Sequence, residues 1–126
     1  MFLVNQNGSC IRLNAVRCMY RSDAPLTDII LHSKTAQVRF HYKSVEEREK
    51  AWCDIHQRLL QAHNGYVADL GPHAIVLDAI EAIDCGLSLV VIYTDAGKFS
   101  YKIKEWENRS EIKENINENL GLYINS

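Results

Sequence analysis

The chain contains an internal repeat, because residues 2–59 are echoed by residues 66–120. The second copy is shorter around the turn at residues 23–25, but apolar positions match on both sides of that turn. The matched pairs include Phe2 and Tyr66, Ile11 and Ile75, Leu13 and Leu77, Val38 and Phe99, and Leu59 and Leu120. Related units within one chain usually pack as a pseudo-symmetric pair. The sequence therefore predicts two units, residues 1–64 and residues 65–126.

Neither unit is large enough to bury a sizeable core alone, since domains of about 60 residues are marginally stable. The 126 residues are 47% apolar and 24% charged, which is ordinary for a globular protein. We therefore expect the two units to pack together. No apolar run approaches the about 18–20 residues of a membrane span, and the N-terminus lacks a signal-peptide pattern, so a cytoplasmic location is predicted.

The first unit shows strand patterns followed by a helix pattern. A hairpin is predicted at residues 2–4 and 10–13 around Asn7-Gly8, with further strands near residues 16–21, 28–32 and 37–43. In the last strand, apolar residues alternate with polar ones. Ser44 and Glu47 form a capping box, which starts a helix over residues 45–62 that Asn64-Gly65 ends.

The second unit repeats this order. Strands are predicted at residues 66–68, 74–77, 80–84, 87–94 and 98–104, and a helix at about residues 106–120. An apolar tail follows, which we expect to act as an interface by adding to a sheet edge; its residues are Leu122, Tyr123 and Ile124. The predicted fold class is α+β, with two tandem pseudo-symmetric repeats, each a mostly antiparallel β-sheet followed by one α-helix.

Four short segments of the first half resemble FlbD-like small flagellar and regulatory proteins. They are Asn7-Gly8, Leu13-Asn14, residues 29–31 and the helix start at residues 44–47. The second half keeps Leu77-Asp78 but has a different helix start at residues 105–108. The resemblance implies a tandem duplication of a small, non-enzymatic interaction module.

Charge is divided unevenly between the halves. Residues 1–64 hold nine Lys and Arg against six Asp and Glu, whereas residues 65–126 hold five against ten. Opposite charges favour docking of the units or contact between chains, and drift after duplication is the alternative. Trp52 has Lys113 as its counterpart, so Trp52 is predicted to form a contact between units or chains, or to pack in the core.

Basic residues recur on the polar faces of the two matching strands, at Arg39, His41 and Lys43 and at Lys98, Lys102 and Lys104. Together with Arg12 and Arg17, they form a candidate anion- or phosphate-binding site. The alternative is a solvated sheet face, where Lys and Arg also deter aggregation.

The sequence carries no motif for nucleic-acid binding, metal binding or catalysis. The sequence pI of about 6.2 argues against nucleic-acid binding, and no RNP-type motif or zinc-finger spacing occurs. The four cysteines form no C-x-x-C pair, so they are expected to be small buried residues, with no metal and no cofactor. No catalytic motif for hydrolysis or phosphate transfer is present, so no enzymatic activity is expected.

The resulting hypothesis is a non-enzymatic binding protein that acts through surfaces, as a homo-oligomer, on a host protein. Inhibitors from phages or mobile elements have this character. A first alternative is a protein that sequesters a phosphate-bearing small molecule such as a cyclic nucleotide. A second alternative is a thiol- or metal-responsive regulator.

Overall fold

The computed structural model describes residues 1–22 and 25–102. The helix predicted at residues 106–120 lies outside these residues, as do Lys104 and the tail Leu122, Tyr123 and Ile124. Among the described helices, none has the length and apolar character needed to cross a membrane.

The first half forms the predicted strands in the predicted order. They are β1 (Phe2–Val4), β2 (Cys10–Arg12), the 3-10 turn η1 (Leu13–Ala15), β3 (Cys18–Arg21), β4 (Asp28–His32) and β5 (Gln37–His41). The side chain of Asn5 accepts hydrogen bonds from the amides of Asn7 (3.0 Å) and Ser9 (2.9 Å), which shapes the tight turn between β1 and β2. Gly8 adopts φ +86° there, a conformation that disfavours other residues.

The single described helix, α1 (Val45–Ala62), follows β5. Ser44 Oγ accepts a hydrogen bond from the Glu47 amide at 3.2 Å, and the Glu47 carboxylate accepts one from the Lys43 amide at 3.3 Å. The first contact is the serine half of the predicted capping box and satisfies an amide that the first turn leaves free, whereas Glu47 reaches the amide one residue before the N-cap. Asn64 and Gly65, with φ of 54° and 82°, end the helix as predicted.

The second half adds five strands and a second 3-10 turn. They are β6 (Val67–Asp69), β7 (His73–Val76), η2 (Leu77–Ala79), β8 (Ile80–Cys85), β9 (Leu89–Thr94) and β10 (Gly97–Lys102). The order of strands and 3-10 turns is thus the same in both halves. A helix in the second unit remains a prediction, because only α1 lies among the described residues.

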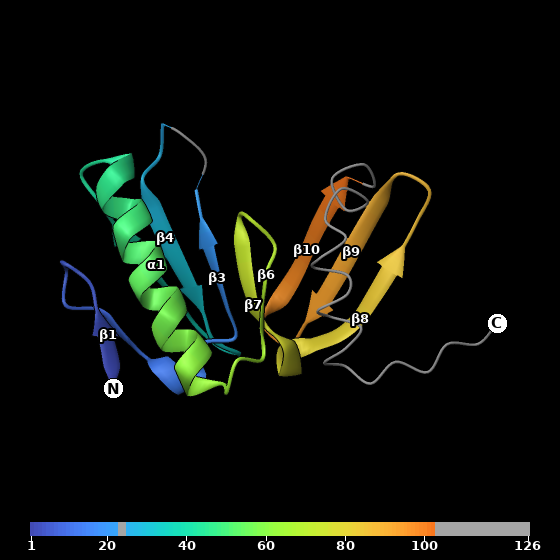
Figure 1. The fold of residues 1–126 in the computed structure, drawn as a ribbon, viewed down its shortest axis with the longest axis horizontal. Coiled ribbons are helices and arrows are strands. Elements are labelled where there is room, and N and C mark those ends of the chain that lie inside the picture. The colour runs from blue at the N-terminus through green and yellow to red at the C-terminus, as the bar shows by residue number, and fades with distance from the viewer. Residues whose placement is uncertain (23–24, 103–126) are drawn as a thin grey trace.

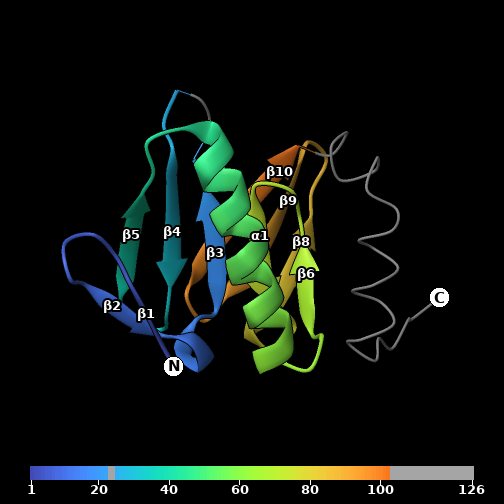
Figure 2. The ribbon, with the colours of Figure 1, turned by 60° about the vertical axis from the view of Figure 1, so that its left-hand side comes forward.

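The strands do not divide between sheets at the boundary of the two halves. A five-stranded sheet has the order β5-β4-β3-β7-β6, so β6 and β7 join the first half through the pairing of β3 with β7. A three-stranded sheet has the order β10-β9-β8, and β1 and β2 form a separate hairpin. α1 covers one face of the five-stranded sheet, and the three-stranded sheet stands on the other side (Figures 1 and 2). All described pairings are antiparallel, which confirms the α+β class.

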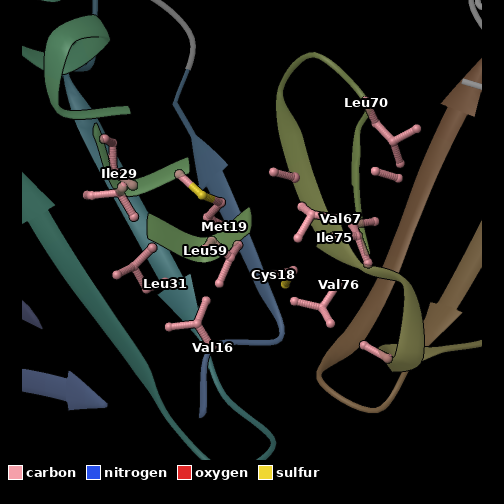
Figure 3. Packing of buried hydrophobic residues seen from close by; sticks show 14 of the residues in the cluster. Val16, Cys18, Met19, Ile29, Leu31, Leu59, Val67, Leu70, Ile75 and Val76 are labelled. Carbon is pink, nitrogen blue, oxygen red and sulfur yellow. The ribbon is translucent and has the colours of Figure 1, made fainter. Parts of the chain in front are cut away.

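The core joins α1 to the five-stranded sheet. Met19, Ile29, Leu31 and Leu59 each have 0% exposed surface and belong to one cluster of buried side chains (Figure 3). The alternation predicted for β5 is confirmed: Val38 and Phe40 are buried, whereas Arg39 and His41 are exposed. Burial of each large apolar side chain contributes about 1.5–3 kcal/mol, so this cluster fixes α1 on the sheet.

Candidate functional site

Two of the predicted anion-binding residues bind a carboxylate of the chain itself. Asp28 in β4 is buried, and it accepts hydrogen bonds from the Arg39 guanidinium and from Nδ1 of His41 at 2.7 Å. Burial alone would raise the pKa of Asp28, but the hydrogen bonds and charges of His41 and Arg39 hold this pKa below its usual value. Arg39 and His41 are therefore already bound to a buried acid of the chain itself.

The other predicted basic stripe lies in the three-stranded sheet. Lys98 and Lys102 are exposed on one face of β10, and Phe99 and Tyr101 on the opposite face point toward the five-stranded sheet. The two stripes thus lie on separate sheets, one on β5 and the other on β10 (Figure 2).

The remaining predicted residues are dispersed. The Arg12 guanidinium lies 5.0 Å from the centre of the Phe2 ring, on the β1–β2 hairpin. Lys43 is exposed just before α1. Trp52 is only 3% exposed and lies in the core, with the Arg21 guanidinium 4.7 Å from its ring. The structure therefore places Trp52 in core packing within one chain, which was one of its two predicted roles.

Arg17 belongs to an ionic cluster that links turns from the two sheets. Its Nε donates to Asp95 Oδ1 at 3.1 Å, and its second terminal nitrogen lies 3.1 Å from Asp95 Oδ2. Nζ of Lys34 lies 3.9 Å from the same Oδ2. Asp95 lies in the β9–β10 turn, Lys34 in the β4–β5 turn, and Arg17 just before β3. This arrangement joins the three-stranded sheet to the five-stranded sheet.

Two open hollows lie at this end of the molecule. One has a volume of about 190 Å³ and is lined by His32, Ser33, Lys34, Thr35, Ala36, Gln37 and Ala96. The other has a volume of about 330 Å³ and is lined by Asn14, Ala15, Arg17, Ser33, Lys34 and Thr35. We call this region the turn end and define it by Asn14, Arg17, Lys34, Thr35 and Asp95. Figure 2 shows η1 and the β4–β5 turn together at the lower end of the five-stranded sheet.

The turn end offers hydrogen-bond donors to solvent. The Lys34 side chain is 66% exposed, and the side chains of Asn14 and Thr35 are also exposed. Acidic residues at the start of α1, Glu46 and Glu47, lie at the other end of the molecule (Figure 2). The turn end is thus a place where an anion would meet cations and polar groups without facing this acidic pair.

Sequence reasoning missed Lys34 and Asp95. The sequences Ser33-Lys34-Thr35 and Asp95-Ala96-Gly97 indicate turns, and nothing in them indicates a partner for either charge. The repeat does not indicate a shared site either, because Lys34 and Asp95 occupy matching positions and carry opposite charges. Only the docking of the sheets brings Lys34 and Asp95 together.

A second junction between the sheets is aromatic. The ring of His73 in β7 lies 4.8 Å from that of Tyr20 and 4.4 Å from that of Phe99, and Nδ1 of His73 is hydrogen-bonded to the Tyr101 hydroxyl at 2.7 Å. Burial, and secondarily the charge of His32, lower the pKa of His73 to about 4. His73 is therefore neutral at neutral pH and packs as part of the junction.

The cysteines occupy separate places. Cys10 in β2 and Cys53 in α1 are exposed, contrary to the expectation of burial, whereas Cys18 is buried. Burial, and then the charge of Asp95, raise the pKa of the Cys18 thiol to about 12, so it stays protonated. Within residues 1–22 and 25–102, no three His, Cys, Asp or Glu side chains are grouped to hold a metal ion.

Comparisons with known proteins give one structural match. No protein-family model matches the chain, and no curated protein matches it in sequence. The solved structure of a LytTr DNA-binding domain from Bacillus cereus is similar to it, with a TM-score of 0.55. The two share 12% sequence identity over 90% of this chain and 94% of that one. A likeness at this identity shows the shared fold.

This match corrects two expectations from the sequence. Nucleic acid was predicted to be an unlikely partner, and the predicted partners were a host protein or a phosphate-bearing small molecule. Both expectations are contradicted by the match, because the structural neighbour is a DNA-binding domain and the likeness covers 94% of it. The physical reason is that the pI of about 6.2 averages a basic half and an acidic half. Binding depends on the charge of the contacting surface.

Proposed function

We propose that the protein is a DNA-binding regulatory domain. The observation that carries this proposal is the structural likeness to a LytTr DNA-binding domain, which extends over 90% of this chain. The FlbD-like resemblance of the first half implies a small, non-enzymatic interaction module, and the proposal keeps that part of it. We also propose that the chain arose by duplication of one smaller unit. We further propose that the protein acts in the cytoplasm.

The turn end is the surface that we assign to the DNA backbone. Phosphate contacts supply most of the affinity of a protein for DNA, and they come from Lys, Arg and short polar side chains. Lys34, Asn14 and Thr35 provide these groups around open hollows. The two hollows are open to solvent, so a rigid backbone has access to them.

Fluorescence anisotropy with a labelled duplex tests this function. Wild-type protein is titrated into pooled random-sequence duplexes at about 50 mM salt and then at rising salt. We expect saturable binding that weakens as salt rises, because each phosphate contact releases counterions. Sequence selection from the bound fraction then identifies the preferred site. Absence of binding to any duplex at low salt contradicts the proposed function.

Substitution of Lys34 tests the assigned surface. We expect Lys34→Gln to weaken binding and to reduce the salt slope by about 1, as for loss of one phosphate contact. Lys50→Gln is the matched control, because Lys50 is an exposed cation in the first half of α1 and is not among the residues that line the two hollows. Equal effects of the two substitutions would show that only total charge matters, and would remove the turn end from the interface.

A further inference from the structure

We infer that Asp95 occupies the DNA-backbone site from within the chain and thereby limits its affinity. This inference rests on the proposed function, because it concerns the same cations. Asp95 holds both Arg17 and Lys34, which a phosphate would otherwise bind. DNA binding at the turn end is then an exchange of one anion, the Asp95 carboxylate, for another, a phosphate.

The geometry of the Arg17–Asp95 pair is that of a phosphate contact. A guanidinium presents parallel N–H groups that match two oxygens of a carboxylate or of a phosphate. Both oxygens of Asp95 are engaged by Arg17 at 3.1 Å. A phosphate that enters the neighbouring hollow would therefore meet Arg17 in competition with Asp95.

The two cations differ in how firmly Asp95 holds them. The Arg17 and Asp95 side chains are 16% and 23% exposed, which limits screening by solvent. Lys34 makes only a 3.9 Å contact and is 66% exposed, so its attachment is weak. An arriving phosphate would bind Lys34 first, and Arg17 would follow only if the phosphate outcompetes the carboxylate.

The hydrogen bonds within the β9–β10 turn do not involve the Asp95 carboxylate. These bonds run from Thr94 Oγ1 to the Gly97 carbonyl at 2.7 Å and from the Ala96 amide to Thr94 Oγ1 at 3.1 Å. The backbone amide of Asp95 donates to the Ala79 carbonyl at 3.0 Å. Neutral replacements of Asp95 thus leave the hydrogen bonds of the turn in place and change mainly the charge.

The experiment compares DNA binding by wild-type protein, Asp95→Asn and Asp84→Asn in the same anisotropy assay. Asp84→Asn removes one negative charge from an exposed position in β8, so it controls for net charge. We expect Asp95→Asn to bind duplex DNA about 3- to 10-fold more tightly and with a salt slope steeper by about 1 to 2. We expect Asp84→Asn to differ little from wild type.

A second replacement guards against loss of folding. Asp95→Ser also removes the carboxylate and keeps a hydroxyl acceptor for Arg17, and circular dichroism shows whether each variant is folded. Tighter binding by either folded variant supports the inference. If neither binds more tightly, or if Asp84→Asn gives the same gain, the inference is overturned. Failure of wild-type protein to bind duplex DNA overturns the proposed function instead, so the two failures are distinguishable.

Discussion

Acid should weaken the junction between the two sheets through His73. The ring is packed against Tyr20 and Phe99, and its pKa is lowered to about 4 from an ordinary value of 6.5. The unfolded chain therefore binds a proton at this position more readily than the folded protein does. The stabilising effect of a neutral His73 is present above about pH 6.5 and is lost as pH falls toward about 4.

The magnitude follows from the two pKa values. Between about pH 7.5 and about pH 5, this difference lowers the free energy of unfolding by about 2 kcal/mol. The ring of His73 is partly exposed, so screening by solvent reduces the expected loss to between about 1 and about 2 kcal/mol. The pKa of His32 is also lowered by burial, so it adds to the wild-type loss in the same direction.

Urea denaturation followed by circular dichroism at about pH 7.5, 6.5, 5.5 and 5 measures this effect. His73→Phe keeps an aromatic ring in the junction and removes the titrating group. Its absolute stability will differ because the hydrogen bond to Tyr101 is lost. That loss enters equally at every pH, so the comparison uses the slope of stability against pH.

The expected result is a flatter pH dependence for His73→Phe than for wild type, by about 1–2 kcal/mol over this range. Tyr101→Phe is the control, because it removes the hydroxyl that contacts His73 without removing the histidine. Equal slopes for wild type and His73→Phe would refute the reasoning. A wild-type protein that grows more stable as pH falls from neutral would refute it as well.

Two further predictions concern the core and the thiols. Leu59→Ala removes a fully buried side chain between α1 and the sheet, and urea denaturation should show a loss of about 2–5 kcal/mol, against little change for Gln57→Ala on the exposed side of α1. Iodoacetamide should label the exposed Cys10 and Cys53 in folded protein and leave Cys18 unlabelled until urea is added, as read by peptide mass mapping. Rapid labelling of Cys18 in folded protein would contradict its burial.

The local elements were predictable from the sequence because their signals are local. The helix over residues 45–62 has a capping box at one end and an Asn-Gly pair at the other, and the structure has α1 at Val45–Ala62. The strand at residues 28–32 is bounded by turn residues, and β4 has these limits. The alternation of Val38 and Phe40 with Arg39 and His41 predicted which face of β5 is buried.

The arrangement of the strands and the site were not predictable in the same way. The pairing of β3 with β7 joins residues of both halves, and no local pattern chooses it over two separate sheets. Arg39 and His41 have the appearance of an open basic stripe in sequence, but Asp28 from the neighbouring strand binds both. The contact of Arg17 with Asp95 depends on the docking of two sheets, which a repeat alignment does not supply.

The two junctions between the sheets respond to different conditions. Under the proposed exchange of anions, this difference would allow Asp95 to be displaced without unfolding. The Arg17–Asp95 pair is ionic, so salt and competing phosphate weaken it. The junction around His73 is aromatic and neutral, so salt affects it little, whereas acid weakens it. When a phosphate displaces Asp95 at neutral pH, the contacts of His73 with Phe99 and Tyr101 still hold β10 against β7. On the proposed function, DNA binding and the integrity of the fold would thereby be separable.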